Sequence, residues 1–383
     1  MTNQKLKICY IGWAQSIHMQ RIAKWFAQKG HEVSLITDQP AHLDNIKLYD
    51  ISWTPDERPR YIRYLHLSFN IKQIRLLKSL FQIRKLIKEI NPDILHLQTL
   101  YYPSCLGVFA NFKPFVITPW NGDIIWSPNR TSIHKKIVKY ALKRTDFITT
   151  NSSAMLENCL SLGLIENKLR MIQWTGVDLK NFRSRSKDQE LIEKLKLNET
   201  NPIVLSTRSL GDIYNIDIII KAIPMVLREI PDTKFIFTWH NGPKLKEIER
   251  LIDEMNVGDA VRLIGKVNHD EMPKYFNSAD VFVSVSSCDT TPTSLLESMA
   301  SGTPPVVASL KPINETIKDG WNGLVVPQKD PESTAKAIVK LLKDKTLCRL
   351  FTERNLSLVK EIADYDKEMG KMEKLYISLY ENK

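Results

Sequence analysis

The sequence contains few cysteines, no long apolar run and no repeated or low-complexity segment. The five cysteines are odd in number, widely spaced and form no Cys-x-x-Cys pair. A disulfide framework and a zinc site are therefore not expected, and a reducing cytosol fits this composition. No stretch of about 18 uninterrupted apolar residues is present to span a membrane. Because residues 1–8 also lack the pattern of a signal peptide, we expect a cytoplasmic protein.

The sequence contains enough apolar residues to form the hydrophobic cores of ordinary folded domains. The chain has 383 residues, of which 43% are apolar and 25% charged. This composition excludes a disordered or collagen-like chain. At roughly 100–200 residues per domain, the length predicts two or three domains.

Short apolar runs alternate with amphipathic helical stretches along the whole chain. Strands are expected at 7–11, 32–37, 93–97, 115–118 and 147–150, and again at 203–206, 234–239, 261–264, 280–285, 305–308 and 323–326. Helices are expected at 18–29, 71–90, 217–229, 244–255, 269–276 and 294–300. Strands that alternate with helices indicate α/β domains with doubly wound parallel sheets.

The domain boundaries are expected where this alternation pauses. Residues 181–202 are polar with little hydrophobic periodicity and are the best linker between a first domain, 1–180, and a second domain, 203–365. The last stretch, 366–383, shows helical spacing again, and we expect this C-terminal helix to return to the first domain. In two-domain α/β proteins ligands bind where the carboxyl ends of the strands face each other, so we expect the site in the cleft between the domains.

The charge is unevenly distributed. The formal net charge is +11, and residues 1–180 hold 25 basic and 13 acidic residues, whereas residues 181–383 hold 29 and 30. A basic half suggests an anionic partner such as a nucleic acid, an acidic lipid or a phosphorylated ligand.

The richest motif lies at 284–309, where a strand is followed by a Thr/Pro loop and a helix that begins near Ser294. Free amides at a helix N-terminus favour an anion such as phosphate. Asp289 and Glu297 bracket this helix start and can face one ligand. The alternative is an N-cap cluster of Thr293 and Ser294 with Glu297 on a solvated helix face.

This motif resembles the signature of the family 4 glycosyltransferases, also known as glycosyl transferases group 1, which have the two-domain GT-B fold. The family pattern is Glu-x7-Glu followed by AMA-x-G-x-P-VV, and this chain has Asp289-x7-Glu297 followed by SMASGTP at 298–304. The segment 314–327, NETIKDGWNGLVVP, is similar to the family's E-x-I-x-D-G-x-N-G-x-L-V stretch. The resemblance covers nearly the whole chain.

The resemblance implies roles for residues of the second half. Glu297 would bind ribose hydroxyls of a nucleotide, and Asp289, one methylene shorter than the family's glutamate, would contact the donor sugar. Thr291, Pro292, Thr293 and Ser294 match the loop and helix start whose amides hold the diphosphate and sugar in the family. Gly265 and Val267 match a turn that faces the base.

The resemblance also implies that Arg208 neutralises the diphosphate. The alternative for Arg208 is a surface ion pair. A lysine normally stands a few residues later in the family, and here Tyr214 occupies that region, which offers a hydrogen bond but no charge.

Four features of the first half are candidates for the site. Gly12 follows the first strand and permits close approach of a phosphate or sugar, so Gly12 and the adjacent Trp13 are donor-side candidates. The absence of G-x-G-x-x-G gives no support to a nicotinamide site. His18 is an acceptor-side candidate or a packing histidine. Trp120 stands where the family often has histidine, and Asp123 would orient an acceptor hydroxyl or close an Asx turn.

The reaction implied is transfer of a hexose from a nucleotide diphosphate sugar to a glycan, glycolipid or lipid-linked acceptor, with retained anomeric configuration, in polysaccharide or glycoconjugate assembly. We expect no metal and no cofactor beyond the donor substrate, because the only D-x-D, at 364–366, lies in a charged helical region. The alternatives are another GT-B enzyme, such as a sugar-nucleotide epimerase or phosphorylase, and a non-catalytic GT-B protein that binds a nucleotide or partner.

A basic stretch in the first half suggests where an acceptor could be held. From Arg58 to Lys88 there are nine basic residues, no acidic residue and several interleaved aromatic and aliphatic side chains. Such a stretch suits an anionic membrane surface, so peripheral attachment to the cytoplasmic face is one expectation and a solvated, solubilising face is the other. Nucleic acid is not expected, because no recognition motif accompanies the charge.

Overall fold

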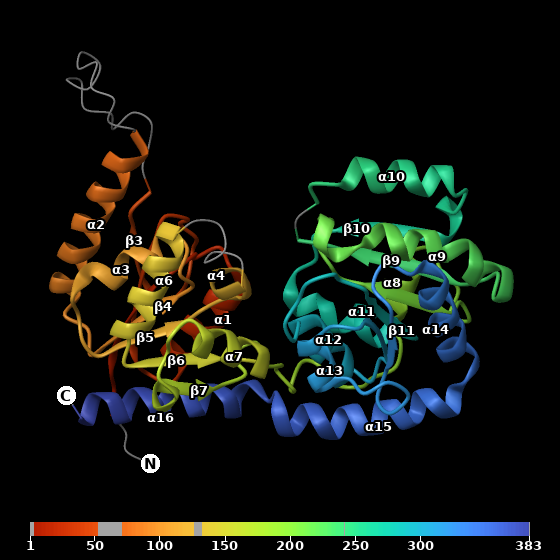
Figure 1. The fold of residues 1–383 in the computed structure, drawn as a ribbon. Coiled ribbons are helices and arrows are strands. Elements are labelled where there is room, and N and C mark those ends of the chain that lie inside the picture. The colour runs from red at the N-terminus through yellow and green to blue at the C-terminus, as the bar shows by residue number, and fades with distance from the viewer. Residues whose placement is uncertain (1–3, 53–70, 126–131, 241, 383) are drawn as a thin grey trace. The chain divides into compact units, whose positions relative to one another are not determined.

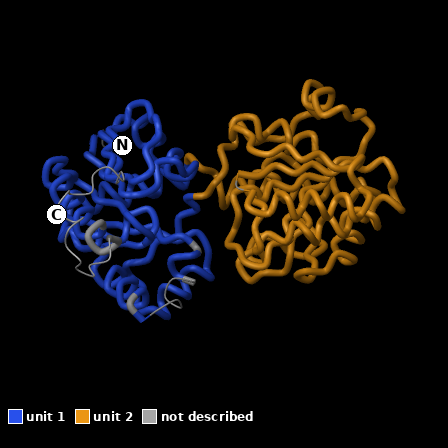
Figure 2. Tube along the Cα trace, turned by 90° about the horizontal axis from the view of Figure 1, so that it is seen from above, with its two compact units in different colours: residues 1–174, 367–383 blue, residues 175–366 orange. Residues whose placement is uncertain are grey.

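The chain forms two compact units, which are coloured separately in Figure 2. The computed structural model describes residues 4–52, 71–125, 132–240 and 242–382. One unit comprises Met1–Trp174 with Lys367–Lys383, and the other comprises Thr175–Asp366. In both units a parallel sheet lies between helices (Figure 1). Among the described helices, none is long and apolar enough to cross a membrane.

The first unit has a seven-stranded parallel sheet of order β3-β2-β1-β4-β5-β6-β7. Its strands are β1 (Lys7–Ile11), β2 (Glu32–Thr37), β3 (Lys47–Asp50), β4 (Ile94–Gln98), β5 (Phe115–Thr118), β6 (Phe147–Thr150) and β7 (Leu169–Met171). Its helices are α1 (Ile17–Gln28), α2 (Ile71–Ile90), α3 (Ser104–Gly107), α4 (Asn121–Ile125), α6 (Ser132–Arg144), α7 (Ser153–Ser161) and α16 (Tyr365–Glu381). The chain order reverses at β1, which pairs with both β2 and β4.

The second unit has a six-stranded parallel sheet of order β10-β9-β8-β11-β12-β13. Its strands are β8 (Ile203–Ser206), β9 (Lys234–Thr238), β10 (Val261–Gly265), β11 (Val281–Ser284), β12 (Pro305–Ala308) and β13 (Leu324–Val326). Its helices are α8 (Gln189–Lys194), α9 (Ile216–Glu229), α10 (Leu245–Glu254), α11 (Met272–Ser278), α12 (Thr293–Ala300), α13 (Lys311–Thr316), α14 (Pro331–Lys343) and α15 (Lys345–Ile362). Here the reversal falls at β8, between β9 and β11.

The strands of the second unit are apolar on both faces because helices cover both faces. Successive side chains of a strand point to opposite sides. Accordingly Val204, Phe235, Val281 and Val306 pack in a core with α9, α10 and α14. Their neighbours Leu205, Ile236, Phe282 and Val307 pack in a second core with α8, α11 and α12. Continuous apolar runs of this kind are typical of buried parallel strands, which is why the sequence locates them well.

The structure confirms the doubly wound parallel α/β fold that the sequence predicts, and it adds elements that the sequence pattern did not indicate: β3, β7, α3, α4, α6, α7, α8, α13, α14 and α15. The short strands β3 and β7 lie at the two edges of the first sheet. The segment 181–202, expected as a linker, contains α8, and its Leu191 and Ile192 are buried in the second unit. The two units instead divide after Trp174 and again after Asp366.

The helix α16 is held in the first unit by buried polar contacts. The hydroxyl of Tyr376 lies 3.3 Å from that of Tyr10 and is hydrogen-bonded to Nδ1 of His96. On the other side of the ring, Nε2 of His96 bonds Oγ1 of Thr118 at 2.7 Å. Phe26 of α1 packs against the rings of both tyrosines. Residues from the two ends of the chain therefore share one core.

Burial lowers the pKa of His96 to about 3, so the folded protein keeps this ring neutral. An unfolded histidine titrates near 6.5. Between these values the unfolded chain binds a proton that the folded chain does not, so stability falls as the pH falls below about 6.5 and is level above it.

We predict that Tyr376→Phe lowers the unfolding free energy of the first unit by about 1–3 kcal/mol, because it removes the buried hydroxyl that contacts Nδ1 of His96 and the hydroxyl of Tyr10. In His96→Gln the loss of stability between neutral and acidic pH should shrink by up to about 1.4 kcal/mol per pH unit. Urea denaturation of wild type and both variants at two pH values measures both effects. An unchanged pH dependence in His96→Gln would contradict the neutral buried ring.

Candidate functional site

The reversal of strand order in the second unit brings two distant loops together. The strands β8 and β11 are neighbours, and Arg208 follows β8 while Asp289 follows β11. The carboxyl ends of parallel strands meet at one edge of a sheet, and the loops diverge where the order reverses, which leaves room for a ligand. Residues 81 positions apart in sequence are thereby in direct contact.

Arg208 is held on three sides by residues that the sequence singles out. Its Nη2 forms an ion pair with Oδ2 of Asp289, and its Nη1 donates to Oγ of Ser294 at 3.3 Å. The guanidinium carbon lies 4.7 Å from the centre of the Tyr214 ring, a cation–π contact. Tyr214 therefore helps to orient the Arg208 guanidinium, whereas the lysine of the family pattern would add a second positive charge.

The Asp289 carboxyl is mostly buried, and this burial raises its pKa above the ordinary value. The Arg208 charge and the backbone N–H of Thr290, which donates to Oδ1 at 3.0 Å, act in the opposite direction. Both side chains of the Arg208–Asp289 pair are about one-seventh exposed. An ion pair shielded to this degree is screened little by salt.

Polar atoms without a partner are concentrated around this ion pair. Among the described residues, Nε of Arg208, Oγ1 of Thr207 and Oγ of Ser206 are buried with no hydrogen bond. The same holds for Oγ of Ser284 and of Ser286, at the end of β11. Each buried unsatisfied group costs about 1–3 kcal/mol, so such a group calls for an explanation. A bound polar ligand would supply the partners.

The helix α12 and the loop after β10 complete this side of the unit. Thr291 and Pro292 are buried at the start of α12, and Thr293 and Ser294 form its first turn. One turn later Glu297 is buried, with Oε1 2.7 Å from Nε2 of His269. The loop that carries His269 begins at Gly265, whose φ of +83° suits glycine, and passes through the half-buried Val267. Sequence reasoning did not identify His269, because its partner lies 28 residues away.

In the first unit, Trp13, His18 and Trp120 lie against one another. The Trp13 ring is 5.5 Å from the Trp120 ring, edge to face, and the His18 ring is 5.9 Å from Trp120. Two aromatic residues that the sequence did not single out join them: Tyr101 stacks on Trp13 at 6.1 Å, and Trp174 stacks on Trp120 at 6.1 Å. Trp174 follows β7, a three-residue strand that the sequence pattern does not show.

Two predicted residues of the first unit have structural positions instead. The Asp123 carboxylate is fully buried and accepts hydrogen bonds from Oγ1 of Thr99 and from the backbone N–H of Leu100 and Trp120. Both of its oxygens are engaged, as in the turn-closing alternative, and burial raises its pKa to about 6. A Cβ on Gly12 would lie 3.2 Å from Gln98 and Met19, so packing accounts for this glycine.

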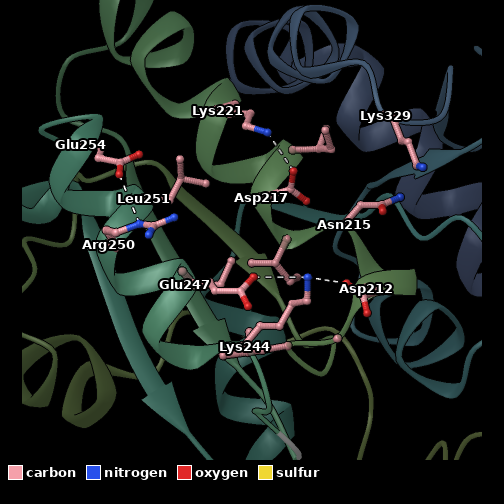
Figure 3. Close-up of a pocket in the computed structure, with 15 residues that line it drawn as sticks. Asp212, Asn215, Asp217, Lys221, Lys244, Glu247, Arg250, Leu251, Glu254 and Lys329 are labelled. Atoms are coloured by element: carbon pink, nitrogen blue, oxygen red, sulfur yellow. Dashed lines mark hydrogen bonds and ion pairs between the residues drawn. The ribbon is translucent and has the colours of Figure 1, made fainter.

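A pocket of about 440 Å³ in the second unit is lined by other residues (Figure 3). It is bordered by α9, α10 and the loop before α9, and it contains none of the predicted site residues. Lys244 lies between Asp212 and Glu247, Lys221 pairs with Asp217, and Arg250 pairs with Glu254. With Lys329, which also lines the pocket, four cations face four carboxylates there, so the pocket offers little attraction to an anion. No group of three or more His, Cys, Asp or Glu in the described chain is arranged to hold a metal ion.

Comparisons with known proteins agree with this arrangement. The model of the family described as "Glycosyl transferases group 1" matches residues 187–357, and that described as "Glycosyl transferase 4-like" matches residues 7–152. An uncharacterized glycosyltransferase of Methanocaldococcus jannaschii is 25% identical, with 88% of this chain and 90% of the relative covered. A galactosyltransferase of Escherichia coli, named as acting on alpha-D-GlcNAc-diphosphoundecaprenol with UDP-Gal, is 24% identical over 82% of each chain.

The solved structure of Anabaena HepE in complex with UDP-glucose has the same fold. Its TM-score is 0.79 at 16% identity, with 98% of this chain and all of that chain covered. At this identity the likeness shows the fold and no more. The two family models, by contrast, match the sequence of both units. The chain therefore belongs to the group 1 glycosyl transferases and is a glycosyltransferase of the GT-B fold.

Proposed function

We propose that the protein transfers a hexose from a nucleotide diphosphate sugar to a carbohydrate or lipid-linked acceptor, with retention of the anomeric configuration. The observation that carries this proposal is the group of buried, unpartnered polar atoms around Arg208 and Asp289. A diphosphate has many acceptor oxygens and a sugar has hydroxyls, and together they match the free N–H and O–H groups. The named substrates of the Escherichia coli relative are of the same two classes.

The ion pair would change partners when the donor binds. The diphosphate would accept from the guanidinium of Arg208, including its free Nε, which leaves Asp289 able to accept hydrogen bonds from hydroxyls of the donor sugar. As the bond to the sugar breaks, negative charge grows on the departing phosphate, and Arg208 with the amides of α12 would stabilise it.

Retention without a covalent intermediate fits the carboxylates of this unit. A retaining hydrolase uses two carboxyl groups about 5 Å apart, one of them as nucleophile. Here the Glu297 carboxylate is engaged by His269, and in the proposal it binds the ribose hydroxyls. Departure of the phosphate and attack by the acceptor on the same face of the sugar, with the phosphate as base, requires no second carboxylate.

We predict that Arg208→Ala weakens nucleoside diphosphate binding by about 10- to 100-fold, because charge-assisted hydrogen bonds are lost. Thermal shift against UDP, GDP, ADP and dTDP, and against their sugars, identifies the donor. A ligand at 100 times its Kd should stabilise the wild type by about 2.7 kcal/mol. Product release from the matching nucleotide sugar then reports turnover, which should fall in Arg208→Ala and in Asp289→Ala.

The matched control is Arg228→Ala, which removes one exposed cation from the same unit, on α9. It should bind and turn over the donor as the wild type does. Equal turnover in wild type, Arg208→Ala and Asp289→Ala would contradict the site, as would the failure of every nucleotide to stabilise the wild type.

The His269–Glu297 contact gives a second prediction. We expect His269→Ala to raise KM for the donor about tenfold with little change in kcat, because the buried carboxylate loses the group that orients it. His269→Gln, whose amide N–H can occupy the position of Nε2, should restore binding. The discrimination between a ribose nucleotide and its 2′,3′-dideoxy analogue should also decline in His269→Ala alone. If both variants retain that discrimination, His269 has no positioning role.

We also propose that the acceptor is reached at an anionic membrane surface through α2. Residues 58–70 of the basic stretch lie outside the described residues, and so do the side chains of the first turns of α2. In the described part of α2, Leu76, Leu77 and Phe81 are exposed, Phe81 to 64%, and Lys78, Lys85 and Lys88 are exposed beside them. Exposed apolar side chains flanked by lysines suit the boundary between headgroups and acyl chains.

We predict that Leu77→Ser with Phe81→Ser weakens binding to phosphatidylglycerol-containing vesicles about tenfold or more. Binding of the wild type should also decline with added salt and with vesicles of phosphatidylcholine alone. Co-sedimentation measures both effects. Ile165→Ser is the control, because Ile165 is exposed to 61% in the same unit but lies outside α2. Equal binding of the double variant and the wild type would remove α2 from the membrane contact.

A further inference from the structure

The five aromatic residues Trp13, His18, Tyr101, Trp120 and Trp174 form what we call the aromatic cluster. It is positioned by the sheet of the first unit. Trp13 follows β1, Tyr101 follows β4, Trp120 follows β5 and Trp174 follows β7, while His18 lies in the first turn of α1. The cluster thus lies at the carboxyl edge of the sheet, and β1, β4 and β5 are adjacent strands at the reversal of order. This edge is where doubly wound folds bind ligands.

The rings of the cluster are in fixed orientations. Trp13 and Tyr101 are nearly parallel, with 13° between their planes, and so are Trp120 and Trp174, with 18°. Trp13 meets Trp120 edge to face, and the His18 ring lies edge-on to both Trp120 and Trp174. Nε1 of Trp13 donates to the backbone oxygen of Tyr102 at 2.9 Å, which fixes that ring further.

Two indole N–H groups of the cluster have no partner. Nε1 of Trp120 and Nε1 of Trp174 are buried and make no hydrogen bond in the described chain. Trp174 is only 6% exposed, so its N–H cannot be satisfied simply by facing bulk water. A buried tryptophan normally finds a partner for its N–H. Two unsatisfied donors on stacked rings therefore point to a ligand that brings acceptor oxygens.

The chemistry of the cluster selects the class of ligand. None of its five side chains carries a fixed charge, and the carboxylate that follows Trp120, that of Asp123, is already fully hydrogen-bonded. Aromatic faces are electron-rich and attract C–H groups, which a sugar ring presents on its faces, while sugar hydroxyls accept from N–H donors at its rim. Trp13, His18, Tyr101 and Trp120 are each partly exposed, so a ring face is accessible from outside.

We propose that the aromatic cluster is a binding subsite for an uncharged sugar ring, the terminal sugar of the acceptor. The assignment as acceptor rests on the proposed glycosyl transfer, whereas binding of a sugar at the cluster does not. Trp13, which the family resemblance places on the donor side, is reassigned to the acceptor side by its contacts with Trp120 and Tyr101.

To test this, the full chain is titrated with the methyl glycosides of glucose, galactose, mannose and N-acetylglucosamine. Binding is measured by calorimetry and by saturation-transfer NMR. Trp120→Phe and Trp174→Phe keep an aromatic ring and remove the N–H. Each should weaken binding about three- to tenfold, the loss of one hydrogen bond, and Trp120→Ala should weaken it further. Trp321→Phe is the control, because Trp321 is an exposed tryptophan of the second unit.

Thermal denaturation checks that each variant is folded, and Trp120→Phe, at a partly exposed loop position, is sufficient if Trp174→Phe unfolds. Nucleoside diphosphate binding is measured in parallel and should be unchanged in all three cluster variants. Equal glycoside affinity in wild type and the cluster variants overturns the inference, and so does the absence of binding by all four glycosides. A wild type that binds a glycoside but no nucleotide refutes the proposed function and leaves the subsite in place.

Discussion

The constraint on which the site depends is the pairing of β8 with both β9 and β11 in one parallel sheet. Parallel strands need crossover connections, so all their carboxyl ends lie at one edge. The reversal of order at β8 sends the crossover helices α9 and α12 to opposite faces of the sheet, and the loops after the adjacent strands β8 and β11 place Arg208 beside Asp289 and Ser294. The same reversal at β1 gathers the aromatic cluster in the first unit. A change that moved β8 out of register would separate these groups without altering one of them.

The second unit retains buried polar groups around Arg208 and Asp289 that lower its stability. Five polar atoms of Ser206, Thr207, Arg208, Ser284 and Ser286 are buried without partners, and Asp289 is a buried carboxyl with a raised pKa. Apolar side chains of similar volume would pack there at a lower free-energy cost. Residues that lower the stability of a fold in this way are usually found where function requires them. The Arg208–Asp289 pair limits the cost, because each charge neutralises the other until a ligand separates them.

The fold was predictable because buried parallel strands are continuous apolar runs between helical stretches, as at 115–118 and 203–206. The pattern fails at β3, where Lys47 and Asp50 are exposed at a sheet edge, and at β7, which has only three residues. The motif around Asp289 and Ser294 was also visible in sequence. His269 and Trp174 were not, since each is defined by a contact with a distant residue. Asp123 is the opposite case. Its residue type and its place after a buried strand suggested a role toward the acceptor, but its carboxylate accepts hydrogen bonds from the backbone N–H groups of Leu100 and Trp120.

Two departures from the family pattern have a common physical character. Trp120 and Tyr214 are aromatic where the resemblance leads one to expect histidine and a cation. The Tyr214 ring lies against the guanidinium of Arg208. Compared with the family pattern, this region has one positive charge fewer, and the aromatic ring helps to orient the guanidinium that remains. Trp13 and Trp120 enlarge the apolar surface at the end of the first sheet. In the proposed function, phosphate recognition would therefore rest on one fixed guanidinium and free hydroxyl groups, and recognition of the acceptor would rest on ring faces with indole N–H groups at their rim.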